Sequence, residues 1–369
     1  MKLVFITDHM KFSGGRRLMF DYALYLMQKG HDVTVLVEKK EGSLADYIPV
    51  KVVPSLSVEY IPQADLIIAT SPKEVRQAWE ARRGKVVHFC QGLELVDLEQ
   101  RIAGEVLPLR YQGKGFFNKL KIFKKKLEWR RKHRIFDDIY KLPTHLVAIT
   151  DPMCKYLEAR YQRPVYLCRN GVDLENLHPQ NAWKPEHFTE ERPMRIANVG
   201  PLDVTYKGIP VTVNAIEIAR ARDIPIDFLR MSPFASKCEM GGGLTYSLLL
   251  NAPRHEFCET MASCDVYISN STEREGFGLP AIEAMASGLI CILSGITAYR
   301  SFSSGSEHCI FVPGDDAEAT ADAIAKIYKM PLNEMTKMRA KAIEVASGFS
   351  HKKACAEFEQ ILEKINTLP

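Results

Sequence analysis

The sequence predicts an α/β protein built from two domains. The chain has 369 residues, which is too long for one ordinary hydrophobic core and suits two domains. Hydrophobic residues make up 46% of it and charged residues 25%, as is typical of soluble globular proteins. Strand-like and helix-like segments alternate through the first half, and the same alternation restarts in the second half.

The first half begins with a strand at 2–7, a glycine loop at 13–15, a helix at 16–29 and a strand at 32–37. This order predicts a parallel sheet with right-handed crossovers. Further short apolar segments continue it, at 66–69, 86–90 and 145–149. In the second half we expect strands at 194–199, 226–231, 266–270 and 289–293. Helices are expected there at 208–222, 280–287 and 316–328, and a last amphipathic helix at 350–365.

The most informative segment is residues 275–283, with the sequence EGFGLPAIE. Gly276 and Gly278 allow backbone N–H groups to approach a ligand closely, and Pro280 suits the first turn of a helix. The start of that helix favours a phosphate, because it carries free N–H donors and partial positive charge. Glu283 can accept two hydroxyl hydrogen bonds, as from a ribose, while Glu275 stays in the loop. The segment predicts a cradle for a sugar nucleotide; the alternative is an ordinary loop with two surface glutamates.

This segment resembles the signature of the family 4 retaining glycosyltransferases, also called glycosyl transferases group 1. That family has the GT-B architecture, two Rossmann-like domains that face a central cleft. The resemblance implies that Glu275 is a catalytic residue that meets the donor sugar. It implies that the donor is also bound by Gly276, Phe277, Gly278, Leu279 and Glu283.

The resemblance also implies a division of the chain. An acceptor domain would comprise residues 1–168, and a nucleotide-sugar-binding domain residues 169–349. The last helix of the family crosses back to the first domain, so residues 350–369 would join it. Asn170 to Asp173, with Pro179 downstream, resembles the family's interdomain segment, although alone it is only a turn before a polar stretch.

Two further pieces resemble the loop that grips the donor diphosphate, Asn198 to Gly200 and Tyr206 to Gly208. Lys207 is the expected phosphate ligand, because its ammonium is a compact charge; the alternative is an exposed lysine before a helix. The family usually has an arginine directly after the first glycine, where this chain has Pro201. Arg230 is our candidate substitute for that missing cation.

The first half carries the other candidates. Gly14 and Gly15 follow the first strand, as the family's glycine loop does, and we expect Gly15 on the donor side and Gly14 on the acceptor side. They do not form a Gly-x-Gly-x-x-Gly fingerprint, so no dinucleotide cofactor is expected. The family often places a histidine near the reacting sugar, at a strand end. His88 is our catalytic candidate there and Gln91 an acceptor-side one; the alternative is a structural histidine.

No metal is expected. The chain has no Asp-x-Asp triplet, which other glycosyltransferases use to hold a divalent cation, and the resembled family uses lysine and helix N-termini instead. Asp315 and Asp316 are better explained as a helix cap. The nine cysteines are scattered, without a Cys-x-x-Cys pair, which indicates a reducing compartment and no structural zinc.

Residues 114–134 concentrate the positive charge. They contain ten Lys or Arg and one Glu, a net charge of +9, whereas the whole chain carries +4 and the remainder therefore −5. Phe116, Leu120, Phe123 and Leu127 fall at helical spacing. A helix of this kind can lie on an anionic membrane surface. The alternative is a helix that packs its apolar side on the core; nucleic acid is not expected, because no recognition motif is present.

Together these features predict transfer of a sugar from a nucleotide-diphosphate donor to a hydroxyl of a saccharide or lipid-linked saccharide. The resemblance implies retention at the anomeric carbon and favours UDP. The basic segment suggests cell-surface polysaccharide or glycolipid synthesis, by a cytoplasmic protein that binds the inner face of the membrane peripherally. Other GT-B chemistry remains open, namely a nucleotide-sugar epimerase or a phosphorylase. A non-catalytic GT-B scaffold in a polysaccharide-assembly complex is the alternative from another class, and Pro201 keeps it open.

Overall fold

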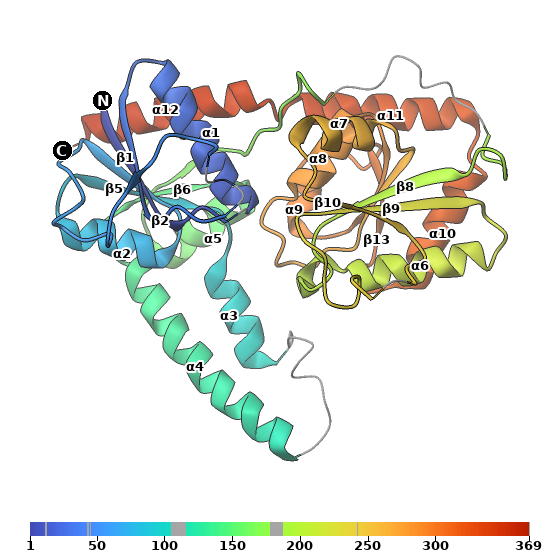
Figure 1. Cartoon of the computed structure of the whole chain (residues 1–369), viewed down its shortest axis with the longest axis horizontal. Coiled ribbons are helices and arrows are strands. Elements are labelled where there is room, and N and C mark those ends of the chain that lie inside the picture. The colour runs from blue at the N-terminus through green and yellow to red at the C-terminus, as the bar shows by residue number, and fades with distance from the viewer. Residues whose placement is uncertain are drawn as a thin grey trace. The chain divides into compact units, whose positions relative to one another are not determined.

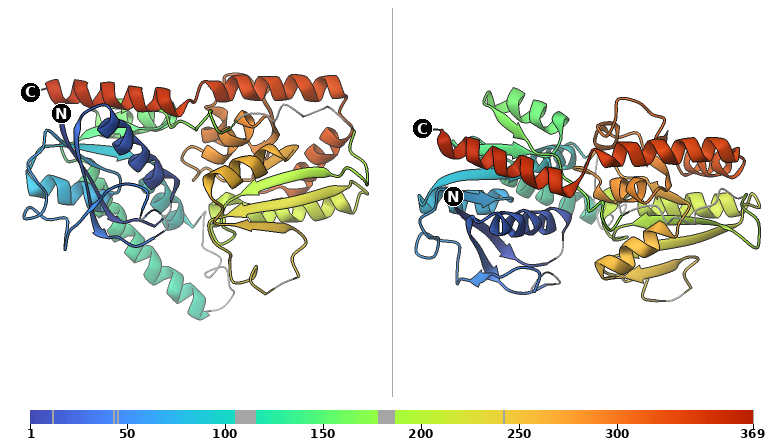
Figure 2. Two further views of the ribbon diagram at one scale, coloured as in Figure 1. Left: turned by 45° about the horizontal axis from the view of Figure 1, so that its top comes forward. Right: turned by 90° about the horizontal axis from the view of Figure 1, so that it is seen from above.

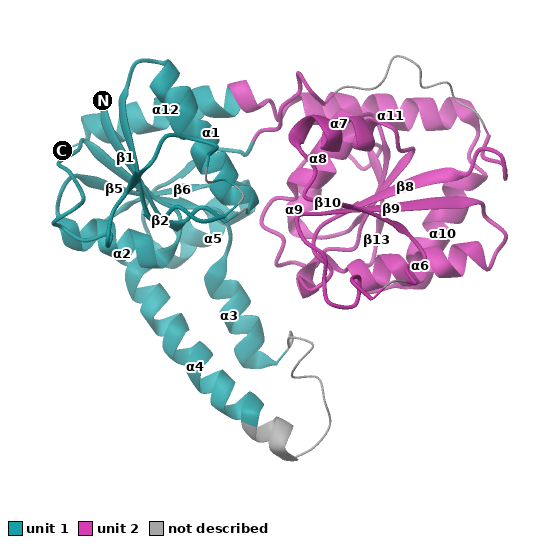
Figure 3. Ribbon diagram, viewed as in Figure 1, with its two compact units in different colours: residues 1–170, 353–369 teal, residues 171–352 magenta. Residues whose placement is uncertain are grey.

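The computed structural model describes residues 1–104, 116–177 and 187–368, apart from residues 12, 43, 45 and 242 and the side chains of 116–120. The chain forms two compact units, residues 1–170 with 353–369 and residues 171–352 (Figure 3). These borders lie within three residues of those expected from the sequence, after residues 168 and 349. Pro179 and Lys114, used in the sequence analysis, lie outside the described residues.

The N-terminal unit contains a seven-stranded sheet in which every pair of neighbouring strands is parallel. Its strands are β1 (Lys2–His9), β2 (Asp32–Lys39), β3 (Lys51–Val52), β4 (Leu66–Ala69), β5 (Lys85–Cys90), β6 (His145–Ala148) and β7 (Val165–Leu167). Strands β1, β2, β5 and β6 of this sheet are labelled in Figure 1. The strand order is β3-β2-β1-β4-β5-β6-β7, so the sequence numbering of the strands reverses between β1 and β4. In open parallel sheets, ligands bind outside the carboxyl ends of the strands at such a reversal.

Helices cover both faces of this sheet, as an all-parallel sheet requires. They are α1 (Gly14–Gln28), α2 (Pro72–Ala81), α3 (Glu94–Ala103), α4 (Phe116–Tyr140), α5 (Asp151–Tyr161) and α12 (His351–Thr367). On one face, α2 and the end of α4 pack on the strands through Val75, Ala78 and Ile139. Elsewhere Phe358 of α12 stacks on Tyr22 of α1 and Phe89 of β5, at ring-centroid distances of 4.8 and 4.9 Å. The last helix is therefore part of the N-terminal core (Figure 2).

The C-terminal unit contains a six-stranded parallel sheet with the order β10-β9-β8-β11-β12-β13. Its strands are β8 (Met194–Val199), β9 (Ile226–Ser232), β10 (Ser247–Leu250), β11 (Val266–Ser269), β12 (Ile290–Ser294) and β13 (Cys309–Val312). The strand order reverses between β8 and β11. The loops after these two strands are the ones in which the sequence placed the diphosphate grip and the two glutamates.

The helices of this unit are α6 (Ile209–Arg220), α7 (Arg254–Ala262), α8 (Leu279–Ala286), α9 (Thr297–Arg300), α10 (Ala317–Tyr328) and α11 (Leu332–Ser347). On one face, α6 and α10 form a core with the strands, to which Ile216, Phe228 and Ile324 belong. The two parallel sheets confirm the predicted α/β fold. Most expected segments agree with the structure to within two residues at each end, including β4 and β8, whose bounds are identical.

One close approach joins the two loops at the β8–β11 reversal. Gly208, which precedes α6, has a φ of +63°, and a Cβ added there would lie 1.9 Å from the carbonyl oxygen of Asn270. The Asn270 side chain accepts a hydrogen bond from Thr212 of α6 at 2.8 Å and donates one to Thr320 of α10 at 2.9 Å. Only glycine allows the start of α6 to meet the end of β11 in this way.

Gly208→Ala should therefore lower the free energy of unfolding by about 3 kcal/mol, because backbone overlap adds to the strain of a positive φ. Gly243→Ala is the matched control, since Gly243 has a φ of +73° and a Cβ there would meet nothing within 4 Å. That control should cost about 1 kcal/mol. Denaturant unfolding of both variants measures the difference, and equal losses would contradict the role given to Asn270.

Candidate functional site

The loops after β8 and β11 lie against each other in the C-terminal unit. Gly200, directly after β8, has a φ of +136° and turns the chain away from the strand. The short 3₁₀ turn η2 (Thr205–Lys207) then ends at Gly208. The backbone N–H of Thr272, after β11, donates to the carbonyl oxygen of Tyr206 at 2.8 Å. The backbone thus holds the candidate side chains of both loops at one edge of the sheet.

Lys207 and Glu275 form an ion pair at this edge. The Lys207 Nζ lies 2.6 Å from Glu275 Oε2, and the two side chains are 16% and 10% exposed. The Ser271 hydroxyl donates to the same carboxylate oxygen at 3.1 Å. Burial alone would lower the pKa of Lys207, but the negative charge and hydrogen bond of Glu275, together with contributions from Tyr299 and Tyr206, outweigh burial and raise that pKa. Lys207 therefore stays charged, and the structure brings together two residues that the sequence assigned to one donor.

The glycine loop enters α8 as the sequence predicted. Gly278 is the N-cap residue of α8 with a φ of +90°, and no side chain caps the helix there. A Cβ on Gly278 would lie 2.2 Å from the Tyr299 ring, so this position requires glycine. The Phe277 ring is buried against Phe302 and Phe349. Phe277 therefore offers a ligand its backbone and not its ring.

Glu283 has a partner that the sequence analysis missed. Arg254, the first residue of α7, donates from Nη1 to Glu283 Oε1 at 2.7 Å. Burial would raise the pKa of Asp173, but its hydrogen bonds with Asn176 lower that pKa. The positive charge of Arg254 also contributes to the lowering. No sequence motif marks Arg254, because its role depends on α7 and α8 lying side by side. It places a cation beside the carboxylate expected to bind the ribose.

Arg230 lies elsewhere than we expected from the sequence. Its side chain is completely buried, and its guanidinium binds the Glu239 carboxylate and donates to the Gly200 carbonyl oxygen at 2.6 Å and to Asn198 at 3.4 Å. These internal partners oppose a direct contact with phosphate, since a buried guanidinium would have to give them up. Arg230 instead fixes Gly200, the first residue of the candidate loop.

The expected residues of the N-terminal unit divide into two groups. Gly14 and Gly15 form the first turn of α1, where the Ser13 hydroxyl accepts from the Arg16 N–H at 3.2 Å. A Cβ on Gly15 would lie 3.0 Å from the Gln91 side chain, so these two candidates are in contact. Asn170 donates to Gln91 Oε1 at 3.3 Å. The glycine loop and Gln91 thus form one cluster at the carboxyl edge of the sheet.

His88 does not join that cluster. It lies inside β5, two residues before the strand ends, and its ring is completely buried against Tyr140 of α4, with the ring centroids 4.5 Å apart. Neither ring nitrogen has a hydrogen-bond partner. Burial, with a smaller contribution from the positive charge of Arg163, lowers the pKa of His88 to about 3. This placement favours the structural alternative over a catalytic role.

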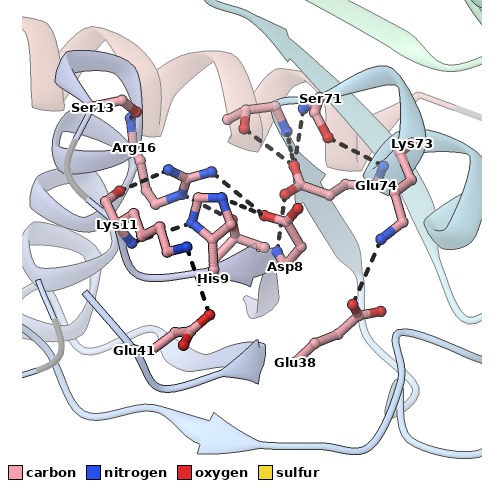
Figure 4. A network of polar contacts seen from close by, with 12 residues as sticks. Asp8, His9, Lys11, Ser13, Arg16, Glu38, Glu41, Ser71, Lys73 and Glu74 are labelled. Carbon is pink, nitrogen blue, oxygen red and sulfur yellow. Dashed lines mark hydrogen bonds and ion pairs between the residues drawn. The ribbon is translucent and has the colours of Figure 1, made fainter.

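A polar network that the sequence analysis missed occupies the β1–β4 reversal (Figure 4). The Asp8 N–H donates to Glu74 at 3.1 Å, and Glu74 also completes the capping box of α2. Arg16 of α1 approaches Asp8 at 3.5 Å and donates to Thr7 at 3.2 Å, while His9 lies 3.6 Å from Asp8. These charges lie at the end of β1 and the start of α1, beside Gly14 and Gly15 in the chain.

Among the residues that the structure describes, no group of three or more His, Cys, Asp or Glu side chains could hold a metal ion. Asp316 caps α10 as expected, accepting from the Ala319 N–H at 2.9 Å. Of the helices in the described ranges, none combines the length and apolar composition of a membrane span.

The fold of the chain is similar to that of solved structures. The structure resembles sucrose-phosphate synthase from Thermosynechococcus elongatus, with a TM-score of 0.72 and 15% identity over 99% of each chain. It also resembles Anabaena HepE in complex with UDP-glucose, with a TM-score of 0.74 and 16% identity over the whole of both chains. These likenesses show the GT-B fold.

Sequence comparisons show the family. The model for glycosyl transferases group 1 matches residues 239–346, which include Glu275 and Glu283, and the model for glycosyltransferase family 4 matches residues 12–176. Between them the two models match most of the chain. The chain therefore belongs to the family 4, or group 1, glycosyltransferases, as the resemblance implied.

Two curated relatives match part of the chain. One is the GDP-mannose:cellobiosyl-diphosphopolyprenol alpha-mannosyltransferase of Xanthomonas campestris, 32% identical over 164 residues, which are 42% of this chain and 41% of that protein. The other is the phosphatidyl-myo-inositol mannosyltransferase of Mycolicibacterium smegmatis, 29% identical over 135 residues, 36% and 35% of the two chains. The matches thus span about two fifths of these relatives or less.

The buried neutral His88 should make stability depend on pH. Its pKa is depressed in the folded state, so its contribution is complete above its unfolded value of about 6.5 and is lost as the pH falls towards 3. Between pH 7 and pH 5 this loss amounts to about 2 kcal/mol. His88→Phe, which keeps a ring against Tyr140, should flatten the pH dependence of the unfolding free energy by that amount. Parallel curves for the two proteins would contradict this account, because they would show that folding leaves the pKa of His88 unchanged.

Proposed function

We propose that the protein transfers a sugar from a nucleotide-diphosphate sugar to a hydroxyl of a saccharide or lipid-linked saccharide, with retention at the anomeric carbon and without a metal ion. The observation that carries this proposal is the arrangement at the β8–β11 reversal. There a mostly buried lysine, a carboxylate and the N-terminus of α8, which no side chain caps, lie at one sheet edge. These are the groups that a diphosphate and a polyhydroxylated sugar require together.

Each group has a proposed role in the reaction. Lys207 and the backbone N–H groups of Gly276 to Leu279 bind the diphosphate, and Glu283 binds the ribose. Charge develops on the diphosphate as the sugar departs, so Lys207 and the positive end of α8 stabilise the leaving group. They could supply by themselves the positive charge that a metal ion provides elsewhere, which is why we propose metal independence. Glu275 orients the sugar.

The acceptor is proposed to bind at the N-terminal unit, near Gly14 and Gln91. The names of the two relatives describe mannosyl transfer, in one case to a diphosphate-linked polyprenol and in the other to a phosphatidylinositol. Both acceptors are lipids, which supports a lipid-linked acceptor here. One relative's name specifies GDP-mannose, whereas HepE is described with UDP-glucose, so donors of both nucleotides belong in the test.

The test begins with thermal unfolding in the presence of UDP, GDP, ADP, TDP and CMP, each with and without EDTA. One nucleoside diphosphate should raise Tm whether or not EDTA is present. Glu283→Ala should then weaken binding of that nucleotide about tenfold, because the ribose loses its acceptor. Glu256→Ala, an exposed carboxylate of α7, is the matched control and should change affinity less than twofold.

Sugar transfer is then measured with the matching nucleotide sugar, and the product's anomeric configuration reports on retention. Conversion of the nucleotide sugar without an acceptor would indicate an epimerase instead. Absence of binding by every nucleotide would contradict the transferase and favour a non-catalytic scaffold.

We also propose that α4 binds an anionic membrane surface. The helix is present as expected, and Phe123 and Leu127 are 58% and 47% exposed, so these two side chains do not pack on the core as the alternative required. The same helix also carries exposed cations, namely Lys121, Lys124, Arg130, Arg131, Lys132 and Arg134. Exposed apolar side chains and cations on one helix suit the interface of an anionic bilayer. Peripheral binding there would bring the protein to a lipid-linked acceptor.

Sedimentation with vesicles tests this surface. The protein should bind phosphatidylglycerol vesicles and bind phosphatidylcholine vesicles at least about tenfold more weakly, since each cation near the surface contributes about 1 kcal/mol. Arg130→Glu with Arg131→Glu should abolish the preference, and Phe123→Ser with Leu127→Ser should weaken binding to both. Val58→Ser removes another exposed apolar side chain of this unit and is the control. Equal binding to both vesicles by the unchanged protein would rule out the electrostatic account.

A further inference from the structure

The Lys207–Glu275 ion pair occupies the place where the proposed donor would bind. Lys207 is the proposed ligand of the diphosphate and Glu275 that of the sugar, yet each is bound to the other at 2.6 Å. Neither can serve a donor fully while this bond persists, because a carboxylate beside the ammonium neutralises the charge that would attract a phosphate.

We propose that Lys207 exchanges partners when the donor binds. In the free protein Glu275 holds Lys207; in the complex Lys207 binds the diphosphate, and Glu275 is released to accept hydrogen bonds from sugar hydroxyls. This inference rests on the proposed function. The Glu275 carboxylate competes with the diphosphate for the Lys207 ammonium. The apparent affinity for a nucleotide is therefore lower than it would be with Lys207 unpaired.

The exchange keeps every buried charge paired. An ammonium that is mostly buried can leave a carboxylate only for another anion, and a diphosphate provides one. Glu275 would then keep the hydroxyl of Ser271, 3.1 Å away, and would need further donors. Sugar hydroxyls supply them, whereas a free nucleoside diphosphate does not. The pair therefore favours a nucleotide that carries a sugar over one that has lost it, which also helps the product to leave.

The surroundings allow the side chain to move while the backbone stays. The Thr272–Tyr206 hydrogen bond and the contact of Gly208 with Asn270 fix both loops. The aliphatic part of Lys207 lies along Gly200, where an added Cβ would be 3.4 Å from its Cγ. Its ammonium lies 5.6 Å from the centre of the Tyr206 ring, whose face attracts a cation. Rotation about side-chain bonds of Lys207 is sufficient for the exchange.

Titration calorimetry with the nucleoside diphosphate that stabilises the protein tests the competition. Glu275→Gln should tighten binding about tenfold, because a neutral amide holds the ammonium less strongly. Glu273→Gln is the matched control: it removes the same charge from the same loop, but Glu273 is exposed and accepts from the Thr297 N–H instead. That control should change affinity less than twofold. In the Lys207→Met background, Glu275→Gln should have no further effect.

Turnover separates this account from a simple binding role. Glu275→Gln should lower kcat at least about tenfold while the nucleotide binds more tightly, since the sugar loses its acceptor. A weakened or unchanged affinity in Glu275→Gln, with wild-type binding intact, would overturn the exchange and leave the proposed function standing. Failure of the wild-type protein to bind any nucleotide would instead contradict the proposed function itself.

A second readout needs no substitution at the pair. The side-chain ammonium signal of Lys207 in ¹H–¹⁵N spectra, assigned by its loss in Lys207→Arg, should be visible in the free protein because the ion pair slows its exchange with water. It should shift on addition of the nucleoside diphosphate. A signal that remains unchanged at saturation would show that Lys207 keeps its partner, and would overturn the proposal even if Glu275→Gln failed to fold.

Discussion

The contact between Gly208 and the Asn270 carbonyl oxygen is the constraint on which the candidate site depends. It holds the start of α6 against the end of β11, at the point where the strand order of the C-terminal sheet reverses. The ion pair of Lys207 and Glu275 joins the same two loops, as does the hydrogen bond from the Thr272 N–H to the Tyr206 carbonyl oxygen. Because Gly208 has no Cβ, the side chains of Lys207 and Glu275, far apart in the sequence, can meet near the N-terminus of α8.

Much of this could be predicted from sequence, because the determinants are local. Alternating apolar segments indicated the parallel sheets, and glycine and proline marked the loop that becomes the start of α8. Lys207 and Glu275 could both be assigned to a donor from their short motifs. The sequence did not reveal that they bind each other. They lie 68 positions apart, with β9, β10 and β11 between them in the chain, and only the fold brings both to one sheet edge.

Burial and distant partners are what local sequence patterns could not indicate. Arg230 resembled a spare cation, but Glu239 and the Gly200 carbonyl occupy its guanidinium inside the unit. His88 resembled a strand-end residue, but β5 continues past it and Tyr140 covers it. Arg254 was missed because its partner lies 29 positions away on another helix. Local patterns indicate which residue types are present. The burial and the partners of Arg230, His88 and Arg254 depend instead on how the folded chain packs.

A crystal structure of the protein with the nucleoside diphosphate that stabilises it tests the central claim most directly. The account predicts that the diphosphate lies at the N-terminus of α8, within hydrogen-bond distance of Lys207 Nζ and of backbone N–H groups between Gly276 and Leu279, with the ribose at Glu283. A diphosphate bound elsewhere, with Lys207 and α8 untouched, would contradict the assignment of this sheet edge as the donor site.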